Sequence, residues 1–132
     1  MDNPFGTELT LANTNIEDAR TKVVDALAVE GFGVLTEIDV RATLKKKLDV
    51  DFRPYVILGA CNPPLAYKTL QADPMIGLML PCNVVVRQEG GDVVVSIVDP
   101  MAMLDVTGNA DLKAVACEAA GRLKRVRDAL TT

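Results

Sequence analysis

Histidine is absent from the whole sequence of 132 residues. This absence excludes Ser-His-Asp triads, Cys-His dyads and every histidine-ligated metal site that the chain could build alone. Tryptophan is absent too, and aromatic residues make up only 4% of the sequence, so the core must be aliphatic.

The chain also has little positive charge and no long apolar run. Its net charge is -4 and its pI is about 4.8, which argues against a broad electrostatic surface for nucleic acid or anionic membranes. No apolar run approaches the roughly 20 residues that span a bilayer. The first residues, MDNPFGTELT, lack the basic and apolar stretches of a secretory signal. We therefore expect a cytoplasmic protein with neither nucleic acid nor a membrane as a partner.

Cysteine is scarce. Cys61, Cys82 and Cys117 are odd in number and show no C-x-x-C spacing, which favours a reducing compartment over a disulfide framework. Nothing in their spacing supports a metal site made of thiolates. We therefore expect no metal and no cofactor.

What is present is an ordinary globular balance, with 49% hydrophobic and 24% charged residues, and the length fits a single domain over residues 1–132. Apolar periodicity predicts alternating strands and helices in the order β-α-β-α-β-α-β-β-α. A hairpin within that order favours a two-layer α+β fold, an antiparallel sheet with helices on one face. The strands are expected at 5–11, 32–38, 55–60, 82–88 and 93–99, and the helices at 14–31, 40–48, 63–70 and 110–130.

Two helices carry further signals. Thr14 and Glu17 have the spacing of a capping box at the start of the first helix. The last helix has an apolar seam that would pack on its own sheet or on a second subunit. The seam consists of Leu112, Ala116, Ala119, Leu123, Val126 and Leu130.

Three Asx-Pro pairs, Asn62-Pro63, Asp73-Pro74 and Asp99-Pro100, precede potential helical turns. The residue before a proline is driven out of the helical region, its side chain can cap the first turn, and proline fits the first helical position. For Asn62 and Asp99 a direct role in binding a ligand stays open beside capping.

The hairpin places two of these candidates together. With Gly90 and Gly91 as its turn, Val84 faces Ile97 and Cys82 faces Asp99. Directly opposed residues share a face of the sheet. The predicted pair therefore brings a thiol beside a carboxylate at the open end of the hairpin.

Cys61 immediately precedes the expected cap Asn62. A helix N-terminus stabilises anions and can lower the pKa of a thiol. Free cysteine is also among the most buried residue types and often only packs. Both interpretations of Cys61 stay open.

Four blocks of sequence, GFGVLTEIDV, YVILGACNPPLAYK, IGLMLPCNVVV and VSIVDP, resemble the domain of unknown function family 302, in order and over nearly the whole chain. The resemblance implies a TATA-box-binding-protein-like α+β domain, often a homodimer, without an established activity. Relatives often carry a histidine where this chain has Tyr67, so no mechanism that needs an imidazole beside Cys61 is possible here. The matching positions are Gly59, Cys61, Asn62, Pro63, Ala66, Pro81, Cys82, Asp99 and Pro100.

These observations favour a dimeric small-ligand-binding or accessory protein, whose unidentified small molecule lies near Cys61, Asn62, Cys82 and Asp99. One alternative is an enzyme with a redox or nucleophilic cysteine. Another is a structural module that binds a partner through the polar hairpin face or the last helix.

Overall fold

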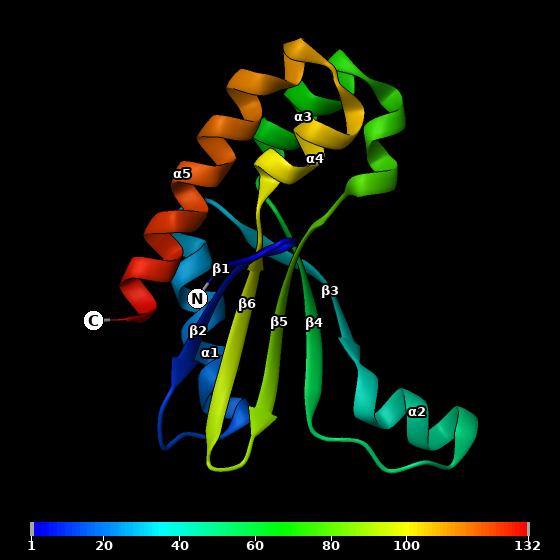
Figure 1. Cartoon of the computed structure of the whole chain (residues 1–132), viewed down its shortest axis with the longest axis vertical. Helices are drawn as coiled ribbons and strands as arrows, with labels where there is room; N and C mark the ends of the chain where they lie inside the picture. The colour runs from blue at the N-terminus through cyan, green and yellow to red at the C-terminus, as the bar shows by residue number, and fades with distance from the viewer. Residues whose placement is uncertain (1, 132) are drawn as a thin grey trace.

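The structure, a computed structural model, describes residues 2–131, and the side chains of all of these except 2 and 103–106. Strands and helices alternate along most of the chain, as Figure 1 shows. The strands are β1 (Asp2–Asn3), β2 (Gly6–Leu11), β3 (Gly33–Asp39), β4 (Tyr55–Cys61), β5 (Cys82–Glu89) and β6 (Asp92–Val98). The helices are α1 (Ile16–Val29), α2 (Val40–Leu48), α3 (Pro63–Ala72), α4 (Pro100–Thr107) and α5 (Lys113–Leu130), with short 3-10 helices η1 (Pro74–Met79) and η2 (Ala110–Leu112).

Within residues 2–131 the strands form one antiparallel sheet in the order β1-β2-β6-β5-β4-β3. The predicted α+β class and the antiparallel sheet are therefore confirmed. The two-residue β1, the helix α4 and the two 3-10 helices are additions to the predicted order. The register of the hairpin is also as predicted, with Val84 opposite Ile97 and Glu89 opposite Asp92.

The core lies on one face of this sheet. Alternate residues of β5 and β6 are fully buried, among them Val84, Val86 and Val95, as expected of an antiparallel sheet covered on one side. In Figure 1 helix α1 lies behind the strands and α5 runs along their left side, and these two helices supply the other half of the core. The helix residues buried against the sheet include Ala19, Val23, Leu27, Leu123 and Val126. Four of the six predicted seam residues, Leu112, Ala119, Leu123 and Val126, are thus buried within their own chain, and Ala116 and Leu130 are half-buried.

The capping box predicted at the start of α1 is wrong by one residue. Asn15, not Thr14, is the N-cap, and its Oδ1 accepts a hydrogen bond of 2.9 Å from the backbone N–H of Asp18. Its Nδ2 in turn donates to the Asp18 carboxylate at 3.0 Å. Asparagine is a better N-cap than threonine, and Asn15 and Asp18 satisfy each other, which leaves Glu17 without the predicted capping role.

The remaining helix starts follow the Asx-Pro pattern. Asn62 caps α3, Asp73 caps η1 through a 3.0 Å bond from the Met75 N–H, and α4 begins at Pro100. Helices α3, η1 and α4 lie together beyond one end of the sheet, opposite the β5–β6 turn (Figure 1). Within residues 2–131, no helix combines the length and the apolar character needed to cross a membrane.

Candidate functional site

The joint between β4 and α3 is built around Asn62. Its backbone is extended, with φ -102° and ψ 105°, as expected for a residue before proline. Its Oδ1 accepts a hydrogen bond of 3.3 Å from the backbone N–H of Leu65, and Pro63 takes the first helical position, where no donor is needed. The local sequence thus ends the strand and starts the helix within two residues.

Asn62 also connects this joint to the end of α1. Its Nδ2 donates to the backbone oxygen of Glu30 at 3.3 Å, and the same oxygen accepts a 3.0 Å bond from Arg122 of α5. Gly31 has φ +83°, and a Cβ there would lie 2.9 Å from the Asn62 Nδ2, so this turn requires glycine. Asn62 is only 7% exposed, and both ends of its amide are engaged by the protein.

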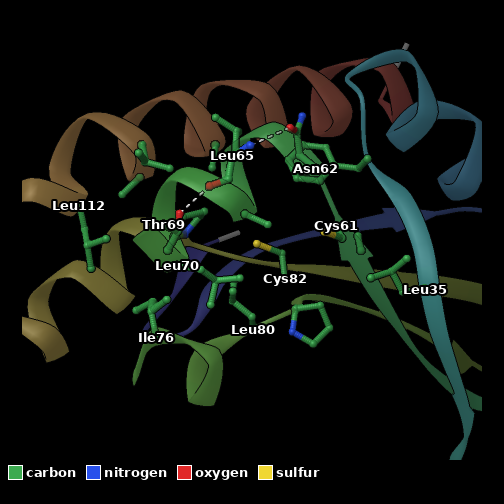
Figure 2. Close-up of a pocket in the computed structure, with 18 of the residues that line it drawn as sticks. Leu35, Cys61, Asn62, Leu65, Thr69, Leu70, Ile76, Leu80, Cys82 and Leu112 are labelled. Carbon is green, nitrogen blue, oxygen red and sulfur yellow. Dashed lines mark hydrogen bonds between the residues drawn. The ribbon is translucent and has the colours of Figure 1, made fainter. Parts of the chain in front are cut away.

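A cavity of about 330 Å³ lies beside this joint, between the end of the sheet and the helices around it. Figure 2 shows side chains from β3, α3, η1 and β5 surrounding one space. No Asp, Glu, Lys or Arg is among the described residues that line it. These residues are Phe32, Leu35, Thr36, Ala60, Cys61, Asn62, Leu65, Ala66, Thr69, Leu70, Ile76, Leu80, Pro81, Cys82, Pro100, Leu112, Val115, Ala116 and Ala119.

Few polar groups of the wall are available to a ligand. The Thr69 hydroxyl donates to the backbone oxygen of Leu65 at 2.7 Å, and Figure 2 draws this bond beside the one that Asn62 accepts. The polar atoms of Thr69 and Asn62 already have protein partners, and Thr36 is the other hydroxyl residue in the described lining. The cavity therefore presents mainly hydrocarbon and sulfur.

Two thiols contribute that sulfur. Cys82 is buried and lies opposite Ala60 on β4, whereas Cys61 at the end of β4 is half-buried. Burial raises the pKa of the Cys82 thiol to about 11, and repulsion from Cys61 acts in the same direction. At neutral pH Cys82 is therefore a neutral thiol. Cys117 is exposed on α5, and all three cysteines are free.

Asp99 does not belong to this cavity, and the predicted Cys82–Asp99 pair does not form in the sheet. The β5–β6 ladder ends at Val84–Ile97. The backbone N–H of Asp99 donates to the Phe5 oxygen at 3.0 Å, and its Oδ1 accepts from the Met101 N–H at 2.9 Å. The Asp99-Pro100 unit leaves the ladder to start α4, so Asp99 acts as a cap and borders a groove beside α5 instead. Three of the four candidates, Cys61, Asn62 and Cys82, line the cavity together.

Comparison with known proteins places this arrangement in a family. The family described as "Domain of unknown function DUF302" matches residues 7–130. The chain belongs to the DUF302 family.

A DUF302 protein of known structure has the same fold. The crystal structure of an uncharacterized conserved protein DUF302 from Bacillus stearothermophilus is 31% identical, covers 93% of this chain and 97% of its own, and superposes with a TM-score of 0.83. No curated protein matches the sequence significantly. Tyr67, the position at which the resemblance leads us to expect a histidine in relatives, is 65% exposed. It does not line the cavity of this DUF302 chain.

Sequence reasoning missed the aliphatic wall that makes the DUF302 cavity. This wall includes Leu65 of α3, Ile76 of η1 and Leu112 of η2, and all three side chains are buried. A signal was present in the apolar run from Met75 to Leu80, which is longer than a connecting turn requires. Among the side chains that the structure describes, no three from Cys, Asp or Glu are grouped so that they could hold a metal ion.

Proposed function

We propose that this DUF302 chain binds a small, uncharged, mostly apolar molecule in the cavity between the sheet end and α3, η1 and α5. The observation that carries the proposal is a cavity of about 330 Å³ whose described lining contains no charged residue. Concave, mostly apolar pockets of this size are typical of small-molecule sites.

The cavity volume limits the ligand. An engineered apolar cavity of about 150 Å³ takes up benzene, so a volume of about 330 Å³ has room for on the order of a dozen non-hydrogen atoms. A charged ligand is disfavoured because nothing in the wall would compensate the loss of its hydration. A fused aromatic system of two or three rings, or a medium-length hydrocarbon chain, has the right size and polarity.

The neutral thiol of Cys82 fits this function better than a thiol-dependent reaction. With a pKa of about 11, roughly one Cys82 thiol in 10⁴ is ionised at pH 7, and the thiolate is the nucleophilic form. A buried thiol behaves as a small hydrophobe with a weak donor. Cys82 thus contributes a polarisable contact in the floor of the cavity, and Asn62 contributes the joint that holds α3 in place.

The test is a titration with 1-aminoanthracene, an uncharged fluorophore of suitable size. Wild-type protein should enhance its fluorescence saturably, at one site per chain. Ala116→Phe fills the cavity from α5 and should abolish the enhancement. Ala114→Phe, on an exposed position of the same helix, is the matched control and should bind like the wild type.

Two results would contradict the proposal. One is the absence of saturable binding to folded wild-type protein. The other is equal binding by Ala116→Phe and Ala114→Phe, because the fluorophore would then bind elsewhere. Circular dichroism and thermal melting establish that each variant is folded.

The expected setting is a reducing cytoplasm, in which both cavity thiols stay free. Homodimerisation, which the family resemblance implies, stays a prediction. Sedimentation velocity measures the molar mass and decides between monomer and dimer.

A further inference from the structure

The segment that closes one side of the cavity is unusually apolar on its outer surface. Between Pro63 and Cys82 only Lys68 and Asp73 are charged. Leu78 is 80% exposed and Met75 is 66% exposed. Three further side chains of this segment are exposed as well, namely Tyr67 and Leu70 of α3 and Met79 of η1.

This segment faces the cavity with one side and solvent with the other. Ile76 is 2% exposed and lines the cavity, as do Leu70 and Leu80. Met75 and Leu78 are three residues apart in a 3-10 helix, so they project from the same side of η1. In Figure 1 this part of the chain forms the end of the molecule away from α2 and the β5–β6 turn.

We propose that the α3–η1 end docks on the surface of an uncharged, zwitterionic lipid bilayer, from which the cavity takes up its apolar ligand. This inference rests on the proposed function, since the bilayer is the phase in which such a ligand dissolves. Met75 and Leu78 enter the interfacial region. Leu70 is exposed and also lines the cavity, so it adjoins the path that a ligand would take from the bilayer into the cavity.

The charge of this surface and its place beside the cavity favour lipid as the occupant. The near absence of charge matches a zwitterionic lipid surface. The inference departs from the expectation that no membrane is a partner, because the net charge of -4 on which that expectation rested opposes attraction only to anionic lipid. Burying one Leu or Met side chain strengthens partitioning by about tenfold to a hundredfold, so two such residues give weak, reversible binding.

The experiment measures co-sedimentation of the full chain with sucrose-loaded phosphatidylcholine vesicles. We expect wild-type protein to bind with a partition constant near that of a single myristoyl anchor, about 10⁴ M⁻¹. Leu78→Lys should lower this constant at least tenfold. Leu48→Lys changes the same residue type at a 66% exposed site on α2, at the other end of the molecule, and should bind like the wild type.

The outcomes separate this inference from the cavity itself. If wild-type protein does not bind vesicles, or if both lysine variants bind equally, the docking proposal is overturned, and the 1-aminoanthracene titration without vesicles still decides the cavity. If sedimentation velocity shows a wild-type dimer that Leu78→Lys converts to a monomer, a second copy covers this surface, and bilayer docking is overturned.

Discussion

Replacing Asn62 by alanine separates a structural role from a ligand-binding role. The variant loses the acceptor for the Leu65 N–H and the donor to the Glu30 oxygen. Loss of an N-cap costs about 1 kcal/mol, and loss of a second buried hydrogen bond costs about 1 kcal/mol more. We therefore expect Asn62→Ala to lower the free energy of unfolding by about 2 kcal/mol.

Urea denaturation measures this change. The midpoint should fall by about 1 M with an unchanged slope, because the slope reports the surface exposed on unfolding. Asn15→Ala is the matched control, since Asn15 is also an amide N-cap but is exposed and bonds only within its own helix start. It should cost about 1 kcal/mol.

Ligand binding provides the second half of this test. Under conditions where Asn62→Ala is folded, its affinity for 1-aminoanthracene should stay within a few-fold of the wild-type value. The reason is that the Asn62 amide of the wild type is already engaged by the protein and is not available to the fluorophore. If Asn62→Ala is no less stable than Asn15→Ala and yet loses the fluorophore, Asn62 is a ligand-binding residue and our interpretation of the joint is refuted.

Two further predictions concern the strands that form the cavity floor. A Cβ on Gly59 would lie 2.1 Å from the Thr36 Oγ1 and 2.8 Å from the Pro81 Cγ, so Gly59→Ala should lower the free energy of unfolding, measured in urea, by about 2 kcal/mol. Adding Thr36→Ala should restore part of that loss, and no recovery would contradict this steric explanation. The pKa of Cys82 is raised from 9.0 to about 11 in the folded protein, so the unfolded chain loses this proton at a lower pH than the folded one. The resulting contribution to the free energy of unfolding is fully present below about pH 9 and is lost as the pH rises toward 11. Relative to Cys82→Ala, the wild type should therefore lose roughly 2 kcal/mol between pH 8.5 and 10.5 under reducing conditions, and parallel pH profiles for the two proteins would count against the buried neutral thiol.

Local chemistry made much of the fold predictable. The two turn glycines set the hairpin register, which the structure reproduces as far as Val84–Ile97. The Asx-Pro pairs marked the starts of α3, η1 and α4. These features depend on a few neighbouring residues, and such residues carry the same preferences in many proteins.

The errors arose where a competing local contact or a distant one decided the outcome. Thr14 and Asn15 are both residue types that cap helices, but only one residue can be the N-cap of α1. That residue is Asn15. Extending the hairpin to Cys82 and Asp99 failed because the proline after Asp99 starts a helix and takes Asp99 out of the ladder.

The cavity was the least predictable feature. Its wall combines residues from β3, α3, η1 and α5, whose relative placement depends on packing between elements far apart in the sequence. Cys61, Asn62 and Cys82 were placed near one another by sequence reasoning. The hydrocarbon around them, which gives the site its chemistry, had no spacing pattern of its own.

The most direct test of the central claim is a methyl NMR titration with naphthalene, an uncharged apolar molecule that fits the cavity. The methyl resonances of Ile76 and Leu112, which line the cavity, should shift saturably through the ring current of the bound molecule. Those of Val23 and Leu27, which are buried in the core but do not line the cavity, should stay in place. Unchanged Ile76 and Leu112 signals at saturating naphthalene would contradict the account.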